Sequence, residues 1–363
     1  MATLPEPRNQ SEDTVVSTAE SVDASRSPRT KVTISDVARM AGVSMSTASR
    51  VIRGASSVSP RTRERVMNAV EVTGYTADPF ARTLRSSGNL GVVAVVVPDI
   101  GDPYFAQLYS HLQEFALARG EGILLGSHLE DYAAQTDVLA QLAVYRPAAV
   151  VLVPAPGTTP RDVEQLQAQG IGVVVVDRPV GGVVVDCVLA ENEVGAEALV
   201  TSTVGPEDRV AVAMLPRQIW TQERRLDAVT TALGRRGLQP VAVVEETAAL
   251  AQTSGKFSRI LEQEPTVVIS LSLTSAMGVL RQQSELGGPS MRIAAFDTHP
   301  WFDLITTEVT TASQNPRQVA STIDGLVVRR RAEAAAPAQT SVLPFALGVN
   351  RAAQLRGAEG GAG

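Results

Sequence analysis

The sequence has a single cysteine, Cys187, among 363 residues, so no disulfide can form within the chain. Long apolar runs are also missing: stretches such as 91–98 and 173–176 fall far short of the roughly 20 residues that span a bilayer. The first residues, MATLPEPRNQSEDTVV, lack the apolar core of a signal peptide. These absences argue against a secreted or membrane-bound protein, and we expect a cytoplasmic one.

The motifs of the common enzyme classes are missing as well. The sequence contains no Walker phosphate loop, no GxGxxG after a predicted strand and no GxSxG. Its three histidines, His111, His128 and His299, do not have the spacing of metal ligands. The sequence therefore predicts no catalytic residues, no metal and no cofactor, and we do not expect an enzyme.

Charge is unevenly distributed along the chain. The net charge is −6 overall, but residues 29–85 carry ten Arg or Lys against four acidic residues, a net charge of +6. A basic module on an acidic body is typical of a protein that binds the phosphate backbone of nucleic acid. A solvated basic face is the alternative interpretation, and charge alone does not decide between them.

The longer part of the chain alternates Val- and Ala-rich strands with amphipathic helices. Continuous apolar strands of this kind indicate parallel sheets covered on both faces, and about 270 residues of the pattern suggest two doubly wound, Rossmann-like subdomains. We expect the last strand over Val342–Leu347, after a helix over Pro316–Arg331. The strands expected before it are Leu90–Val97, Gly122–Gly126, Ala148–Val153, Val173–Asp177, Val210–Met214, Val241–Val244, Thr266–Ile269 and Ile293–Phe296.

Three short helices are predicted between residues 33 and 75. Thr33 and Asp36 have the spacing of a capping box, and Gly42 stands where a left-handed residue ends a helix. Ser44 then begins a second helix, and Ser59 followed by proline begins a third. A helix, a short turn and a second helix form the geometry that places the second helix in a major groove. An ordinary three-helix cap is the alternative, and the arginines nearby argue against it.

The run VTISDVARMAGVSMSTASRVI resembles the N-terminal signature of the LacI/GalR family of bacterial transcriptional regulators. The similarity continues without a gap through VSPRTRERVMNAVEVTGYTADPFARTLRSS, and then more loosely to the last predicted strand. The resemblance implies a helix-turn-helix domain, a hinge helix and a sensor domain like the periplasmic sugar-binding proteins. It divides residues 31–363 into a DNA-binding domain (31–76), a hinge helix (77–88) and an effector-binding and dimerisation domain (89–363). The residues before them (1–30) are rich in Ser, Glu, Asp and Pro without an apolar period, which predicts a disordered arm.

The resemblance assigns the second helix to DNA recognition. Met45 and Ser46 begin this helix, where side chains reach base edges. Arg50 lies about one turn later, and its guanidinium group can donate two parallel hydrogen bonds to a guanine. Short hydroxyl side chains at the helix starts suit phosphate oxygens. The residues expected at the DNA are Thr33, Ser44, Met45, Ser46, Thr47, Ser49, Arg50, Ser59, Thr62, Ala81 and Leu84.

Ala81 and Leu84 lie in the segment that is similar to the family's hinge helix. By the family pattern, Leu84 is wedged into a base step of the minor groove and Ala81 lies at the contact between two hinge helices. Asp78 stands where the family usually has Asn, which adds a negative charge near phosphates. A plain interdomain linker is the alternative interpretation.

The sensor domain is expected to bind an effector where strands end between its two subdomains. The resemblance implies these effector-binding residues: Asp102, Tyr104, Phe105, Arg178, Trp220, Arg225, Leu273 and Asp297. Two departures make the expected pocket less polar: Ser272-Leu273 replaces the family's Asn-Asp pair, and Glu191 replaces an Asp. A sugar, a less polar metabolite and no effector at all therefore remain open.

Together these features predict a repressor that binds a near-palindromic operator as a homodimer. The C-terminal sequence RAAQLRGAEGGAG has no leucine heptad of the kind that joins dimers into tetramers in this family. The alternative is a solute-binding protein of a transport system, which has the same sensor fold but no DNA role. The basic module argues against that alternative.

Overall fold

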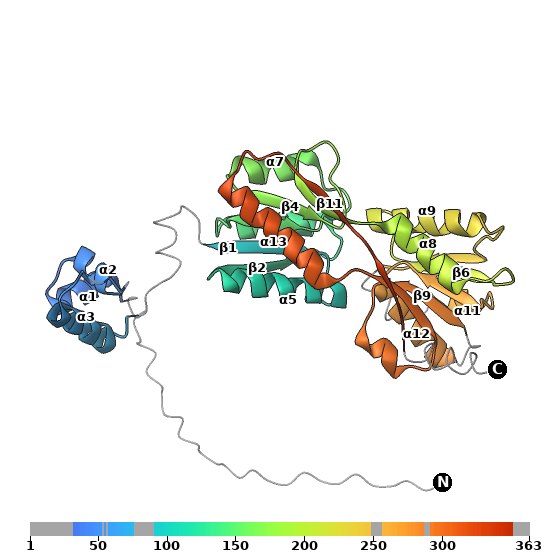
Figure 1. The fold of residues 1–363 in the computed structure, drawn as a ribbon, viewed down its shortest axis with the longest axis horizontal. Helices are drawn as coiled ribbons and strands as arrows, with labels where there is room; N and C mark the ends of the chain where they lie inside the picture. The colour runs from blue at the N-terminus through green and yellow to red at the C-terminus, as the bar shows by residue number, and fades with distance from the viewer. Residues whose placement is uncertain are drawn as a thin grey trace, which may run out of the picture. The chain divides into compact units, whose positions relative to one another are not determined.

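The computed structural model describes residues 32–52, 54–55, 57–75, 91–247, 256–286 and 291–350. The chain divides into two compact units, Met1–Pro79 and Phe80–Gly363, which are described separately (Figure 1). The predicted arm (1–30) and the predicted hinge helix (77–88), with Ala81 and Leu84, lie outside the described residues.

Within its described residues, the first unit has three helices that begin and end where the capping residues predict. They are α1 (Ile34–Ala41), α2 (Met45–Ile52) and α3 (Pro60–Thr73). Thr33 and Asp36 form the capping box of α1, and Gly42 ends it with φ +60°. The Oγ atom of Ser44 accepts a hydrogen bond from Thr47 N (3.1 Å), and Ser59 caps α3 by accepting from Thr62 N (3.3 Å). These bonds satisfy backbone donors that a helix start leaves unpaired.

Small side chains form the core of this three-helix unit. Ala38 and Ala41 of α1 pack against Ala48 and Val51 of α2, and Val66 of α3 is fully buried among them. Alanines at the crossing allow the helices to approach closely. The unit therefore has a core of its own.

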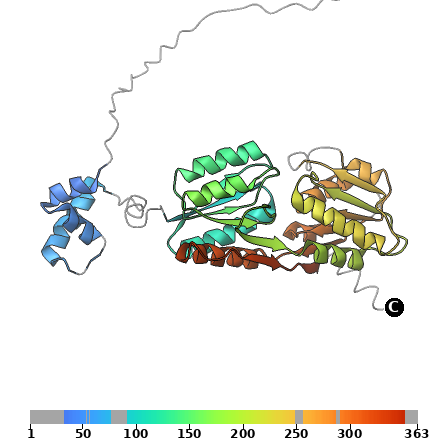
Figure 2. The ribbon, with the colours of Figure 1, turned by 90° about the horizontal axis from the view of Figure 1, so that it is seen from above.

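The second unit has two lobes, and the first is built on a parallel six-stranded sheet (Figures 1 and 2). Its strand order is β11-β5-β4-β3-β1-β2. The strands are β1 (Val92–Val97), β2 (Gly122–Ser127), β3 (Ala149–Leu152), β4 (Gly172–Val176), β5 (Asp186–Ala190) and β11 (Thr340–Leu343). One face is covered by α5 (Pro103–Ala118) and α13 (Pro316–Ala332), and the other by α6 (Tyr132–Ala143) and α7 (Pro160–Ala168).

The second lobe repeats this plan with a sheet ordered β12-β10-β9-β8-β6-β7. Only its edge strand β12 runs antiparallel. The strands are β6 (Val210–Met214), β7 (Ala242–Glu245), β8 (Val267–Ser270), β9 (Arg292–Phe296), β10 (Val309–Ser313) and β12 (Ala346–Val349). Helices α8 (Asn192–Thr203) and α9 (Trp220–Gly234) cover one face; α11 (Ser258–Leu261), α12 (Leu273–Leu286) and the 3-10 helix η1 (Pro300–Leu304) cover the other.

The central strands are apolar on both faces because helices cover both. All six residues of β1, VVAVVV, are buried, as are all five of β6. This confirms the predicted fold class: a helical N-terminal unit followed by two doubly wound α/β lobes. In both lobes the carboxyl ends of the parallel strands form the edge at which such folds bind ligands.

The chain crosses between the lobes three times: after β5, after β10 and between β11 and β12. The predicted single strand Val342–Leu347 is wrong, because two strands in different sheets occupy this region, separated by Pro344 and Phe345. Proline has no N–H for a ladder bond, which explains the break. The sequence also failed to predict β5 and β10, which immediately precede the other two crossings.

Candidate functional site

Helix α2 presents a polar face to solvent and an apolar face to the three-helix core. Met45, Ser46 and Arg50 are exposed, whereas Ala48 and Val51 are buried. Met45 is 54% exposed, although a methionine of this helix would normally pack inside. The residues predicted to read bases thus share the face that the core leaves open.

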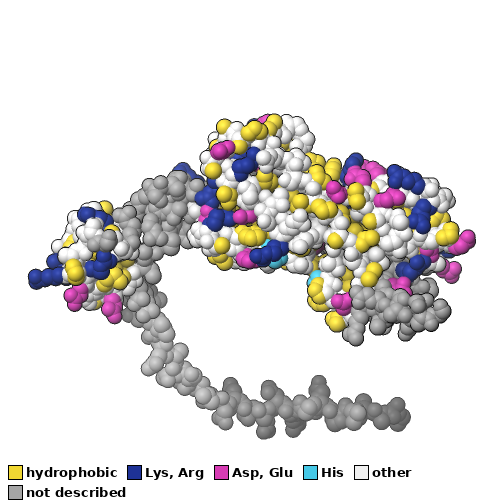
Figure 3. Space-filling view, viewed as in Figure 1, with side chains coloured by type: hydrophobic (Ala, Val, Ile, Leu, Met, Phe, Trp, Pro, Cys, Tyr) yellow, Lys and Arg dark blue, Asp and Glu magenta, His cyan; other side chains and the backbone are white. Residues whose placement is uncertain are grey.

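Basic side chains gather on the visible face of this unit (Figure 3). Three of its arginines have partners within the unit: Arg65 donates to the carbonyls of Ala41 and Gly42, Arg63 donates to Ala55 O, and Arg39 pairs with Asp36. Arg65 therefore fixes the turn before α2. Sequence reasoning assigned these arginines only to the general charge of the module.

In the second unit, polar side chains collect where the strands of both lobes end. Asp177 directly follows β4 and Asp297 directly follows β9, and both adopt left-handed φ angles (+69° and +68°). Such angles are unfavourable for a residue with a Cβ, and they cluster at functional sites. Each backbone N–H is fixed by the neighbouring strand: Asp177 N donates to Val188 O, and Asp297 N donates to Ala312 O. The two carboxylates are thereby held at equivalent strand ends.

Arg178, next to Asp177, is buried and forms a bidentate ion pair with Glu130. Its Nη1 and Nη2 atoms each lie 2.6 Å from a Glu130 carboxylate oxygen, and Nη1 also donates to Pro154 O (2.9 Å). The Nε atom donates to Asp177 Oδ2 at 3.2 Å. Paired charges of this geometry are strong and directional. Glu130 was not predicted from the sequence.

His128 positions Glu130. Its Nε2 atom lies 2.9 Å from Val153 O, and Glu130 N donates to its Nδ1 atom at 3.2 Å. These partners fit the neutral tautomer with the proton on Nε2. Burial lowers the pKa of His128 below its usual value, which favours the same neutral form.

Arg225 of α9 is the second buried arginine of this region. Its Nε donates to Asn192 Oδ1 (2.9 Å), its Nη1 donates to Leu271 O (2.8 Å), and Nη1 also lies 3.6 Å from Asp297 Oδ2. The guanidinium lies over the Phe296 ring, 4.3 Å from its centroid. The arginine is therefore held by the second lobe and directed at Asp297.

Near these charged side chains, two hydrogen bonds join the lobes, and a third joins the first lobe to a segment that crosses between them. Thr274 Oγ1 donates to Asp102 Oδ2 (2.9 Å), and Thr221 Oγ1 lies 3.5 Å from Asp177 Oδ2. The Tyr104 hydroxyl donates to Gln314 Oε1 at 3.2 Å, in the crossing after β10. Side chains of both lobes thus meet in one cluster, which consists of Asp102, Tyr104, Glu130, Asp177, Arg178, Arg225 and Asp297. We call this cluster the interlobe cleft.

Burial dominates the electrostatics of the cleft. It raises the pKa of Asp297 to about 6, and Asp102 and Asp177 raise it further while Arg225 opposes them. Burial also raises the pKa of Asp102 and that of the Tyr104 hydroxyl. These groups act on one another, so they form one electrostatic site.

Comparison with known proteins gives the family. Residues 33–78 match "Bacterial regulatory proteins, lacI family", and residues 90–332 match "Periplasmic binding proteins and sugar binding domain of LacI family". The chain belongs to the LacI family. This LacI-family protein is therefore a DNA-binding transcriptional regulator, which confirms the predicted resemblance and the expectation that it is not an enzyme.

Relatives within the LacI family match this chain over different lengths. The maltose regulon regulatory protein MalI of Escherichia coli K12 is 27% identical over 337 residues, covering 87% of this chain and 97% of MalI. The regulator GalS of Salmonella typhimurium LT2 is 33% identical over 165 residues, covering 46% of this chain and 48% of GalS. The Lac repressor dimer bound to operator and an anti-inducer has a similar fold, with a TM-score of 0.73 at 21% identity; the match covers 89% of this chain and 99% of that one.

Three predicted effector residues of this LacI-family chain have other surroundings. Phe105 and Leu273 are buried in the hydrophobic cores of the first and second lobes, respectively. Trp220 is half-buried at the start of α9, and the guanidinium of Arg224 lies 5.7 Å from its ring centroid. Leu273, which was expected to make the pocket less polar, thus packs in the core of the second lobe, as Phe105 does in that of the first.

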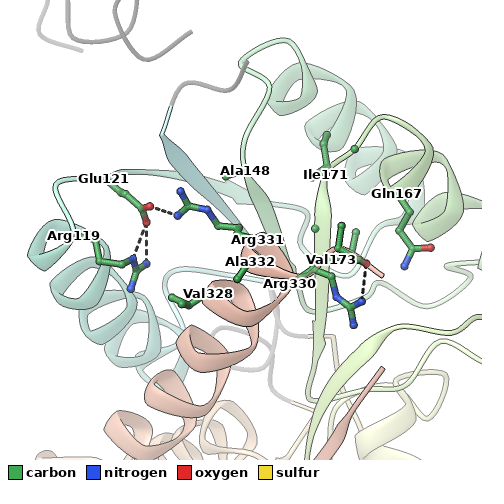
Figure 4. Close-up of a pocket in the computed structure, with 13 residues that line it drawn as sticks. Arg119, Glu121, Ala148, Gln167, Ile171, Val173, Val328, Arg330, Arg331 and Ala332 are labelled. Carbon is green, nitrogen blue, oxygen red and sulfur yellow. Dashed lines mark hydrogen bonds and ion pairs between the residues drawn. The ribbon is translucent and has the colours of Figure 1, made fainter. Parts of the chain in front are cut away.

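A separate hollow of about 690 Å³ lies at the opposite, amino-terminal edge of the first sheet (Figure 4). Its charged residues are paired: Glu121 binds both Arg119 and Arg331, and Arg330 binds the buried carboxylate of Asp186. These pairs tie the end of α13 to the sheet. The charged residues of this hollow therefore have a structural role, and none of them is a strand-end aspartate with a left-handed φ angle like those of the interlobe cleft.

The residues that the structure describes lack two further features. No group of three or more His, Cys, Asp or Glu side chains is arranged to hold a metal ion there. No helix in the same part of the chain combines the length and apolar character needed to cross a membrane.

Proposed function

We propose that this regulator binds a near-palindromic operator as a homodimer, acts as a repressor, and changes its DNA affinity when a small molecule binds the interlobe cleft. The exposed face of α2, with Met45, Ser46 and Arg50, carries the DNA part of the proposal. Its arginine suits a guanine edge and its methionine suits an apolar contact, for example with a thymine methyl group. Ser44, Thr47, Ser49, Ser59 and Thr62 then contact phosphates, together with Thr33.

Control by an effector is supported by the cleft. Bonds such as Thr274–Asp102 cross from one lobe to the other, so a ligand bound between the lobes changes which of these bonds form. Lobe closure would alter the pairing of the proposed hinge residues Ala81 and Leu84 in the dimer. A coupling of about 1–3 kcal/mol is the usual scale for such control.

Relatives support a small polar metabolite as effector. A structure of the regulator Cra from Pseudomonas putida contains fructose 1-phosphate, and this neighbour has a TM-score of 0.64 at 17% identity. We propose for this chain that the ligand binds among Asp102, Tyr104, Asp177, Arg225 and Asp297. The strained angles of the two strand-end carboxylates support this choice.

The decisive experiment is to sequence genomic DNA fragments retained by the purified full chain. We expect a shared motif with two inverted half-sites, and sedimentation with a synthetic duplex of that motif should show two chains per duplex. Retained fragments without a common motif, or no retention at low salt, would contradict the proposal and favour a solute-binding role. One chain per duplex would contradict the homodimer.

A further inference from the structure

The interlobe cleft carries an excess of negative charge. Its acidic groups are Asp102, Glu130, Asp177 and Asp297, and its basic groups are Arg178 and Arg225. Asp102 and Asp297 also interact electrostatically with Asp177, although Asp297 belongs to the other lobe. Four carboxylates therefore face two guanidiniums in a site of low solvent exposure.

The two arginines are already engaged by the protein. All three nitrogens of Arg178 donate hydrogen bonds. Both Nη atoms donate to Glu130, Nη1 also donates to Pro154 O, and Nε donates to Asp177. Arg225 donates to Asn192 and to Leu271 O. An anionic ligand at Arg178 would have to displace Glu130, and the freed carboxylate would then repel it, whereas one at Arg225 would meet the Asp297 carboxylate, which lies 3.6 Å from Nη1.

The strand-end carboxylates are less fully engaged than the arginines. Asp297 has Arg225 beside it at 3.6 Å, which is long for a charge-assisted hydrogen bond. Its side chain is 13% exposed and that of Asp177 is 11% exposed, so both carboxylates are largely desolvated but not completely closed off from solvent. A cationic donor placed between them would meet acceptors from both lobes.

We propose that the cleft binds a hydroxylated ligand that carries a protonated amine, and that it rejects ligands carrying phosphate or carboxylate groups. This inference rests on the proposed function, because it assumes that the effector binds in the interlobe cleft. An ammonium group donates up to three hydrogen bonds and accepts none, which matches carboxylates that have lone pairs to share. The ligand's hydroxyls would use the remaining acceptors and the hydroxyl groups of Tyr104 and Thr221.

For ligands of the same shape, electrostatic interactions determine whether the cationic amine, the neutral parent or the anionic derivative binds most tightly. A nearby carboxylate attracts an ammonium group and repels a phosphate group, whereas it affects a neutral ligand of the same shape much less. We therefore expect about tenfold or larger differences in affinity between ligands that differ mainly in charge. Charge is therefore a sharper test than the carbon skeleton.

The test uses isothermal titration of the purified full chain with three matched sets of ligands. The sets are glucosamine, glucose and glucose 6-phosphate; galactosamine, galactose and galactose 6-phosphate; and serinol, glycerol and glycerol 3-phosphate. We expect the amine of at least one set to bind about tenfold or more tightly than its neutral parent, with no binding of the phosphate. Equal or tighter binding of the parent, binding of a phosphate, or no binding by any amine would each overturn the inference.

Two variants test the residues. Asp297→Asn should bring the amine and its parent to within about threefold of each other, and Glu130→Gln, which frees Arg178, should weaken amine binding about tenfold. Glu193→Gln is the matched control, because Glu193 is an exposed carboxylate paired with Arg224 on the surface. An unchanged amine preference in both cleft variants would overturn the inference, and Glu130→Gln serves if Asp297→Asn does not fold.

Measuring DNA binding separately distinguishes a failure of the proposed regulatory function from a failure of the proposed ligand class. A chain that selects an operator but binds no amine retains the proposed regulatory function and loses only the ligand class. A chain that binds an amine but selects no DNA motif loses the proposed function while its cleft chemistry stands.

Discussion

Asp102 and Thr274 join the two lobes through a single hydrogen bond of 2.9 Å, from the threonine hydroxyl to Asp102 Oδ2. Asp102 also caps α5 by accepting from Tyr104 N, and Thr274 lies in the first turn of α12. The same carboxylate thus begins a helix of one lobe and contacts a helix of the other. Its local and interlobe roles can be separated by changing only the threonine.

Thr274→Val should lower the free energy of unfolding by about 1–2 kcal/mol, because a buried carboxylate loses a donor while the shape of the side chain is kept. Urea unfolding measures the change. Thr230→Val on α9 is the control, since Thr230 donates only to backbone carbonyls of its own helix. Equal effects of the two substitutions would show that the interlobe bond contributes nothing of its own.

Arg50→Ala should reduce the preference for operator over random DNA by about 1–3 kcal/mol, because a forked contact to a base edge is lost. Fluorescence anisotropy with matched specific and random duplexes measures both affinities. Arg39→Ala, on α1, removes a similar exposed charge that is paired with Asp36 and should leave the preference unchanged. An equal loss on both duplexes would make Arg50 a phosphate contact instead.

Asp297→Asn should change how stability depends on pH. Burial raises the pKa of Asp297 from 3.8 to about 6, so between these values the folded chain holds a proton that the unfolded chain releases. The contribution of this group to stability is therefore complete below about pH 4 and is lost as the pH rises through about 6.

Urea unfolding across this pH range should therefore favour the variant at the alkaline end. The difference in unfolding free energy between Asp297→Asn and the wild type should move by about 1–3 kcal/mol in the variant's favour from about pH 4 to about pH 8. Asp297→Asn also removes the repulsion between Asp297 and Asp102, which is strongest at high pH and therefore shifts the difference in the same direction. A difference that stays flat with pH would show that Asp297 has an ordinary pKa.

Two glycines within helices should respond in opposite ways to substitution by alanine. A Cβ added at Gly195 in α8 lies 2.7 Å from Phe345 Cδ2 and 3.1 Å from Phe296, whereas one added at Gly325 in α13 meets nothing within 4 Å. Gly195→Ala should therefore destabilise the chain by about 1–3 kcal/mol through overpacking. Gly325→Ala should stabilise it by about 0.5–1 kcal/mol through helix propensity.

Thermal or urea unfolding of both variants checks this pair of outcomes. Stabilisation by Gly195→Ala would show that the two phenylalanine rings can move away from α8. Because these rings stack edge to face beside Arg225, the same variant should also weaken ligand binding in the cleft.

Local signals predicted the parts of the structure that depend on neighbours in sequence. The capping box of Thr33, the left-handed Gly42 and the capping by Ser44 and Ser59 are confirmed, because each involves residues within three or four positions. The alternation of strands and helices likewise predicted both lobes. Periodicity and capping act over a few residues, so they are visible in a single sequence.

Contacts between distant residues could not be predicted in this way. The Glu130–Arg178 pair joins residues 48 positions apart, and Thr274 lies 172 positions from Asp102. Phe105 and Leu273 were assigned to the cleft by family position, yet the packing of each lobe places them in its core. The strands β5 (DCVLA) and β10 (VTTAS) were missed because polar residues interrupt the continuous apolar run that marked most of the other strands, although both precede a crossing between lobes.

The two lobes order their strands identically, and in each the fourth strand along the chain ends in a carboxylate, Asp177 in one lobe and Asp297 in the other. A ligand bound by both carboxylates is chelated by two equivalent groups, one from each lobe. Once one carboxylate has bound the ligand, the other is present at a high effective concentration, so the two contacts reinforce each other. The ligand then dissociates only when both contacts break, so binding to the two lobes is cooperative.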